Sequence, residues 1–155
     1  MQTLVSARLF EPSQHLIELL RARASTGGDE ILELYDAFLL DPGLGPSTYL
    51  TSDGRIVWDD AEFWGVRGTR AEAFAAVVVG AEKTGIGALR SLLPARHAGG
   101  IDCNSCSATG WYDMQGQLRD LEGKPFSIVC STCAGLGWID DSIVLMESVL
   151  EVPRA

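Results

Sequence analysis

All four cysteines of the chain stand in two copies of one short phrase. The first copy, DCNSCSATGWY, carries Cys103 and Cys106, and the second copy, VCSTCAGLGWI, carries Cys130 and Cys133. Two residues between cysteines let both thiolates of one turn reach one metal ion, and two such turns complete a tetrahedron of sulfurs. With 23 residues between the pairs, the pattern predicts one structural Zn²⁺ ion per chain.

Three other uses of the four cysteines are weaker alternatives. Two disulfides are disfavoured because the start, MQTLVSARLFEPS, lacks the basic and apolar regions of a secretory signal, and thiols stay reduced inside cells. An iron–sulfur cluster also takes four thiolates, but ferredoxins space them differently. A thioredoxin-like redox pair would use one C-x-x-C motif near a βαβ unit, and not two similar copies.

Residues for catalysis are harder to identify. Four thiolates fill a tetrahedral zinc ion, so no open position is left for water or substrate. His15 is expected on the polar side of a helix, and His97 precedes the first cysteine as a weak candidate for a supporting group. The carboxylates Asp59, Asp60 and Glu62 could act as an acid–base pair or a cation site, but solvated loop residues are the simpler interpretation. We therefore predict no catalytic residue.

Two helices are expected first among the elements that precede the cysteines and must position them. The segment EPSQHLIELLRARA places Leu16, Ile17, Leu20 and Ala24 on one side of a helix. The segment GGDEILELYDAFLLDPG, residues 27–43, has apolar residues at helical spacing and predicts a second helix. Its polar side is expected to carry three acidic residues: Asp29, Glu33 and Asp36. This acidic side and the segment with Asp59, Asp60 and Glu62 are candidate contact surfaces for a partner.

A hairpin and two further helices are expected next. In STYLTSDGRIVWDD, Asp53 and Gly54 form a two-residue turn, which would set Tyr49 opposite Trp58. The segment TRAEAFAAVVVGAEKTG begins with capping-box spacing and ends at a glycine, so it predicts a helix over about 14 residues. A short helix follows in GALRSLLP.

The composition changes near Ala98, where glycines and cysteines become frequent. We therefore predict an α+β protein with two parts. Residues 1–97 would form a domain of helices and a β-hairpin, and residues 98–155 would form a β-rich zinc module with a C-terminal strand.

The cysteine phrases resemble a known family of repeats. CSTCAGLG is the full C-x-x-C-x-G-x-G repeat of the cysteine-rich region of DnaJ-type co-chaperones, and CNSCSATG matches except that Ala108 replaces the first glycine. The resemblance covers residues 103–138 and implies that the four cysteines are zinc ligands. It also implies that Gly110, Gly135 and Gly137 permit the sharp backbone of the knuckles. No His-Pro-Asp signature of a J-domain is present, so stimulation of an Hsp70 ATPase is not implied.

Each repeat continues into a tryptophan, Trp111 and Trp138. Such rings can shield the metal and supply the core that a small module lacks. Alternatively, they could form an exposed aromatic pair that grips a peptide.

Residues 1–95 are similar in layout to immunity proteins of the SUKH superfamily, which bind and neutralise toxins. The net charge of −9 fits a basic protein partner and weighs against nucleic acid. The longest apolar run, AFAAVVVGA, is too short for a bilayer span. We therefore expect a cytoplasmic, non-enzymatic protein-binding module. The alternatives are an immunity-type protein and a chaperone-like or thiol–disulfide active protein.

Overall fold

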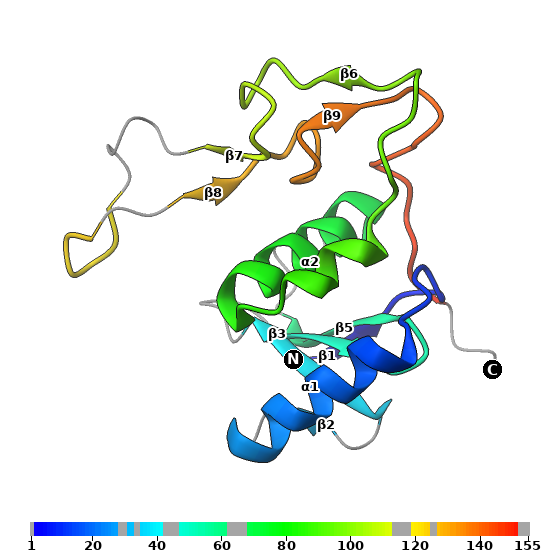
Figure 1. The fold of residues 1–155 in the computed structure, drawn as a ribbon, viewed down its shortest axis with the longest axis vertical. Helices are drawn as coiled ribbons and strands as arrows, with labels where there is room; N and C mark the ends of the chain where they lie inside the picture. The colour runs from blue at the N-terminus through cyan, green and yellow to red at the C-terminus, as the bar shows by residue number, and fades with distance from the viewer. Residues whose placement is uncertain are drawn as a thin grey trace.

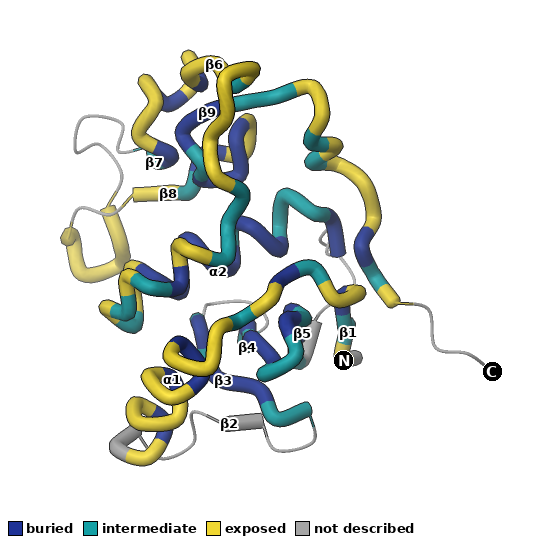
Figure 2. Tube along the Cα trace, turned by 45° about the vertical axis from the view of Figure 1, so that its right-hand side comes forward, coloured by how far each residue is buried: buried dark blue, intermediate teal, exposed yellow. Residues whose placement is uncertain are grey.

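A computed structural model of the 155-residue chain describes residues 2–27, 31–32, 35–41, 47–61, 68–112, 119–124 and 127–151. It has a few helices and antiparallel sheets, so the predicted α+β class is confirmed. Helix α2 lies between a five-stranded sheet on one side and a small module that carries the cysteines on the other (Figures 1 and 2). Within the described residues, no helix combines the length and the apolar character that a bilayer span requires.

The large sheet is antiparallel and has the strand order β1-β5-β4-β3-β2. Its strands are β1 (Gln2–Val5), β2 (Ile31–Leu32), β3 (Ala37–Asp41), β4 (Ser47–Thr51) and β5 (Ile56–Ala61). Phe38, Leu50 and Ile56 are paired across the three central strands, so their buried side chains share one face of the sheet. That face is the floor of the main hydrophobic core.

Helices α1 (Gln14–Gly27) and α2 (Arg70–Thr84) complete this core, which continues into a short 3-10 helix, η2 (Gly87–Leu92). The four residues predicted for the buried side of α1 are all buried, so that prediction is confirmed. Helix α2 packs so closely on β3 at Gly80 that a Cβ atom added there would lie 2.9 Å from Leu40. The short helix predicted in GALRSLLP is also present, in the 3-10 form.

The N-terminus of α2 has the predicted cap. The Thr69 hydroxyl accepts a hydrogen bond from the backbone N–H of Glu72 at 3.2 Å, and Gly85 ends the helix in a left-handed conformation at φ 74°. The predicted helix of about 14 residues has 15. The capping signal therefore located both ends of α2.

The helix predicted over residues 27–43 is wrong. The described part of this segment forms strands β2 and β3, and Asp36 between them has φ 48°, which no right-handed helix accommodates. Residues 37–41 can satisfy a strand pattern as well as a helical one, and β3 pairs with both β2 and β4. Pairing with the neighbouring strands thus overrides the local helical pattern.

The β4–β5 hairpin is confirmed, but its register differs by one residue from the prediction. Tyr49 pairs with Val57 and Thr48 with Trp58. The Thr51 N–H donates to the Arg55 carbonyl at 2.9 Å, so the loop contains three residues, the last of which is Gly54 at φ 93°. A three-residue turn that ends in a left-handed glycine shifts every cross-strand pair relative to a two-residue turn.

The module that carries the cysteines spans residues 101–139 and consists of two small ribbons. Strand β6 (Ile101–Asp102) pairs with β9 (Trp138–Ile139), and β7 (Trp111–Tyr112) pairs with β8 (Ile128–Val129). We call it the cysteine module. Exposed residues gather on its outer side, away from α2 (Figure 2).

After the module, the chain returns to the first part of the protein (Figure 1). The predicted C-terminal strand is wrong for the described part of this tail, residues 143–151, which makes two isolated β-bridges instead, Ser6 with Leu150 and Thr69 with Ser148. Its carbonyl groups at Leu145 and Glu147 accept hydrogen bonds from the first two N–H groups of α2. The tail therefore packs against the N-terminal sheet and caps α2.

Candidate metal centre

The first cysteine pair lies in a tight knuckle, residues 103–110, between β6 and β7. The N–H groups of Ala108 and Thr109 donate to the carbonyl oxygens of Cys103 and Cys106 at 2.9 and 3.2 Å. The N–H of Gly110 donates to the Cys106 sulfur at 3.2 Å. These bonds fold the backbone around the sulfur and turn an amide dipole toward it.

The second pair lies in an equivalent knuckle, residues 130–137, between β8 and β9. The N–H groups of Gly135 and Leu136 donate to the carbonyl oxygens of Cys130 and Cys133 at 3.2 and 3.0 Å. The N–H of Gly137 donates to the Cys133 sulfur at 3.2 Å. The repeated phrase in the sequence is therefore a repeated set of hydrogen bonds.

The two knuckles also hold each other in a reciprocal way. The Cys103 N–H donates to the Gly137 carbonyl at 3.0 Å, and the Cys130 N–H donates to the Gly110 carbonyl at 2.9 Å. The β6–β9 and β7–β8 ribbons continue these contacts on either side. The knuckles are thus related by an approximate two-fold symmetry that brings all four cysteines together.

The sulfur atoms have the spacing of a tetrahedral metal site. All four lie within 4.8 Å of one another, with Cys103 and Cys130 3.8 Å apart and Cys106 and Cys133 3.7 Å apart. A tetrahedron whose corners lie about 2.3 Å from its centre, the usual zinc–sulfur distance, has edges of about 3.8 Å. A disulfide would require about 2 Å between sulfurs, and all four cysteines are free. The donor set therefore fits one tetrahedral metal ion.

Burial and hydrogen bonding act on the thiols in opposite directions. Burial raises the pKa of Cys103 above its ordinary value and raises the pKa of Cys133 to about 12. Burial also disfavours the Cys130 thiolate, but hydrogen bonds from the Tyr112 hydroxyl, 3.2 Å away, and from the backbone of Cys133 and Thr132 lower the pKa of Cys130 to about 6. Cys130 is thus best prepared to be a thiolate, and a divalent cation would stabilise the others.

Glycines occupy the positions at which the knuckles approach each other. Gly110, Gly135 and Gly137 have φ values of 84, 84 and 85°. A Cβ atom at Gly110 would lie 2.4 Å from the Gly135 carbonyl oxygen, and one at Gly137 would lie 2.6 Å from the Ala108 carbonyl oxygen. Both contacts are closer than any side chain allows, so these positions require glycine on steric grounds as well as for φ.

The knuckles differ in what covers them. A Cβ atom at Gly135 would lie 2.9 Å from Val78 of α2, and Ala134 is only 1% exposed. Ala108, which takes the place of Gly135 in the first knuckle, is exposed and has φ 64°. The second knuckle therefore rests on α2, whereas the first faces outward and has room for the alanine methyl group.

The two tryptophans have different surroundings. Trp138 is 6% exposed and packs edge-on against His97, with ring centroids 6.0 Å apart. His97 itself is exposed and pairs with Asp140, and it does not belong to the group of metal-ligating atoms. Trp111 is half-buried on the wall of a cleft beside α2. Of the two tryptophans, therefore, Trp138 is buried and Trp111 is not.

The acidic candidates that the structure describes do not gather at the cysteines. Asp36 lies in the turn before β3, where hydrogen bonds from Ser52 and Arg21 lower its pKa. Asp59 lies in β5 and accepts a hydrogen bond from Thr3 at 2.9 Å, and the backbone of Asp60 is in the same strand. The expectation of a loop at these two aspartates is wrong. His15 is exposed, and three acidic candidates lie outside the described residues: Asp29, Glu33 and Glu62.

Two features of the centre have no signal in the local sequence. One is the contact between the second knuckle and α2, made by Gly135 and Val78. The other is the cleft beside Trp111, which α2 and the module line together. Both depend on how segments far apart in the sequence pack, which repeat spacing and periodicity do not encode.

Comparison of the chain with protein-family models, with curated proteins and with solved structures finds no match in any of the three. The resemblances to DnaJ-type repeats and to the SUKH superfamily therefore stay predictions from the sequence. The four-cysteine centre rests on its own geometry.

Proposed function

We propose that Cys103, Cys106, Cys130 and Cys133 bind one Zn²⁺ ion, and that the ion is structural. The observation that carries this proposal is the set of four buried sulfurs at the edge lengths of a zinc–thiolate tetrahedron. Zinc has no geometric preference from its d electrons and favours four thiolates of this kind over carboxylate or carbonyl ligands. Four ligands complete the coordination shell, which disfavours hydrolytic chemistry at the metal.

The same proposal assigns the chain a non-enzymatic, protein-binding role. A bound ion would fix the cysteine module against α2 and so create a composite surface that neither part has alone. The net charge of −9 supports a basic protein partner, because complementary charge speeds and orients association. Neutralisation of a basic toxin is a narrower form of this proposal and rests on the sequence alone.

Exchange of thiols and disulfides is the less favoured function. Reactive cysteines are exposed to solvent, whereas these four side chains are between 0 and 6% exposed. Their burial supports a structural role.

A matched pair of variants tests the zinc proposal. Cys103→Ser removes one ligand, and Ser131→Ala changes an exposed residue of the second knuckle that supplies no sulfur. We expect Cys103→Ser to lose zinc and to melt at a lower temperature, because metal binding supplies folding free energy in such sites. Ser131→Ala should keep both the zinc and the melting temperature of the parent chain. An unchanged melting temperature for Cys103→Ser would contradict the proposal.

A further inference from the structure

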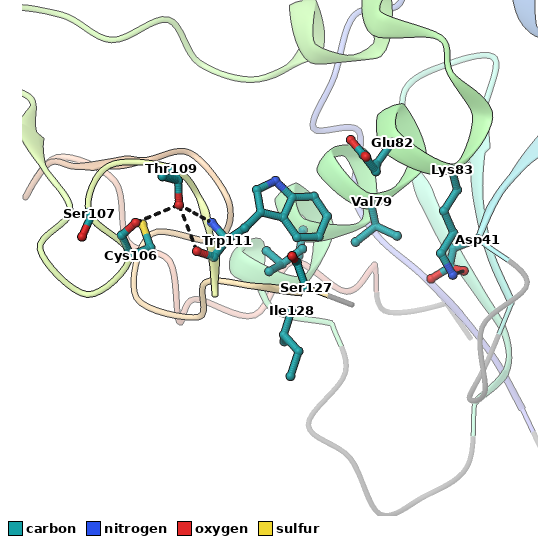
Figure 3. Close-up of a pocket in the computed structure, with 12 residues that line it drawn as sticks. Asp41, Val79, Glu82, Lys83, Cys106, Ser107, Thr109, Trp111, Ser127 and Ile128 are labelled. Carbon is teal, nitrogen blue, oxygen red and sulfur yellow. Dashed lines mark hydrogen bonds and ion pairs between the residues drawn. The ribbon is translucent and has the colours of Figure 1, made fainter. Parts of the chain in front are cut away.

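A cleft of about 1030 Å³ lies where α2 meets the cysteine module. One wall is the outer side of α2, with Val79, Glu82 and Lys83, and the other wall is formed by the first knuckle, Trp111 and β8. Figure 3 shows the Trp111 ring directed toward Val79 and Glu82 across this space. The cleft exists only because the module is held against the helix.

The floor and one side of the cleft are apolar. Val79 and Trp111 are half-buried, and Ile128 is 48% exposed although it is a large aliphatic residue. Aromatic and aliphatic side chains of this kind supply most of the affinity in peptide grooves. An occupant of the cleft therefore needs at least one apolar side chain.

The charge in the cleft is negative and localised. Lys83 pairs with Asp41 at 2.7 Å, so the positive charge in the lining is neutralised. Glu82 is exposed and makes no ion pair with any residue in the described part of the chain. Glu82 and Trp111 line the same cleft from its two walls (Figure 3). A cleft that offers a carboxylate from one wall and an indole ring from the other is a favourable environment for an ammonium or guanidinium group.

The backbone of Trp111 is held in place by the knuckle and the β7–β8 ribbon. The Thr109 hydroxyl accepts a hydrogen bond from the backbone N–H of Trp111 at 3.2 Å and lies 2.9 Å from the backbone carbonyl oxygen of Trp111. The Trp111 backbone also pairs with Val129 across the β7–β8 ribbon. A backbone that is already ordered where it carries the aromatic side chain lowers the entropic cost of binding.

We propose that this cleft binds an extended peptide segment of a partner protein in which a lysine or arginine lies next to an aliphatic or aromatic residue. The basic group binds between Glu82 and the Trp111 ring, and the apolar neighbour packs on Val79 and Ile128. The inference rests on the proposed protein-binding function and specifies which residue types of the partner are recognised.

The test starts from the full-length, zinc-loaded chain and a phage-displayed library of random dodecapeptides. We expect the selected peptides to share a basic residue beside an apolar one. The best peptide, labelled for fluorescence anisotropy, should bind Glu82→Lys about tenfold or more weakly. Trp111→Ala should weaken binding by a similar factor. Added salt should also weaken binding, because the Glu82 contact is at the surface.

Glu18→Lys is the matched control, since Glu18 is an exposed glutamate of α1 outside the cleft. It makes the same change in net charge as Glu82→Lys and should change the affinity by less than about twofold. Zinc content and melting temperature, measured on every variant, establish that a loss of binding is not a loss of folding.

Other outcomes would overturn the cleft inference and separate it from the proposed function. The selected peptides could lack a basic residue, or could bind Glu82→Lys and the parent chain with equal affinity. Either result would place protein binding on another surface and leave the proposed function intact. Recovery of no peptide from a folded, zinc-loaded chain would overturn the cleft inference while the zinc proposal stands. A dimer that Glu82→Lys dissociates would show that a second copy of the chain occupies the cleft instead.

Discussion

Two positions in the knuckles share a backbone conformation but not an environment. Gly135 and Ala108 occur at the same place in the repeat and have φ values of 84 and 64°. Gly135 is buried against Val78, whereas Ala108 is exposed. The departure of the first repeat from the glycine pattern is therefore a consequence of its outward position.

This difference predicts opposite effects of two substitutions. Gly135→Ala should destabilise the fold by roughly 2–4 kcal/mol, because a methyl group adds a clash with Val78 to the strain of a left-handed backbone. Ala108→Gly should stabilise it by roughly 0.5–1 kcal/mol, because it only relieves strain. Denaturant unfolding of the zinc-loaded proteins measures both changes. If Gly135→Ala had no effect, the second knuckle would not rest on α2.

At the scale of elements, α2 is the part that joins the sheet to the metal centre. The backbone N–H groups of its first turn have two kinds of acceptor: the Thr69 hydroxyl and the carbonyl groups of the tail at Leu145 and Glu147. Arg70 adds an ion pair to Glu147 at 2.8 Å. The N-terminus of α2 thus depends on both a local cap and a distant segment.

Removal of the local cap should have a moderate cost. Thr69→Ala should lower the free energy of unfolding by about 1 kcal/mol, because the Glu72 N–H loses its acceptor. Thr69→Ser retains the hydroxyl and should stay close to the parent value. Equal losses in the two variants would show that the Thr69 methyl group, and not the cap, stabilises this turn.

The elements also show which information the sequence contains. The ends of α2 follow from its capping residues, and the grouping of the cysteines follows from their spacing. The segment ILELYDAFLLD has apolar residues at both helical and strand spacing, and only its pairing with residues 47–51 decides in favour of β3. The register of the β4–β5 hairpin depends on whether the turn that ends at Gly54 has two or three residues. The composition of the turn does not decide between these two lengths.

At the scale of the whole molecule, the chain has one large core and one small core. The large core includes residues of both helices, the sheet and the tail, such as Leu16, Phe38, Val77 and Val149. The small core consists of the four cysteines, with Tyr112, Leu136 and Ile139 packed against it. So few apolar residues in the described part of the module favour stabilisation by a metal ion or another cross-link.

Metal removal should therefore unfold the two cores to different extents. Under a strong chelator, we expect backbone amides of the cysteine module, such as Cys103 and Cys130, to lose protection against hydrogen exchange. Amides of β4 and β5 should keep most of theirs, because the large core does not depend on the metal. Hydrogen exchange followed by mass spectrometry resolves these segments. Loss of protection in both regions at once would mean that the chain folds as one cooperative unit around the metal.

The central claim is that the four cysteines share one structural zinc ion, and native mass spectrometry tests it most directly. Protein purified without chelator or reductant should carry the mass of the chain plus one zinc ion. Its four thiols should resist alkylation until a chelator is added, and all four should then react. A metal-free chain with two disulfides, or with four thiols that react at once, would contradict the claim.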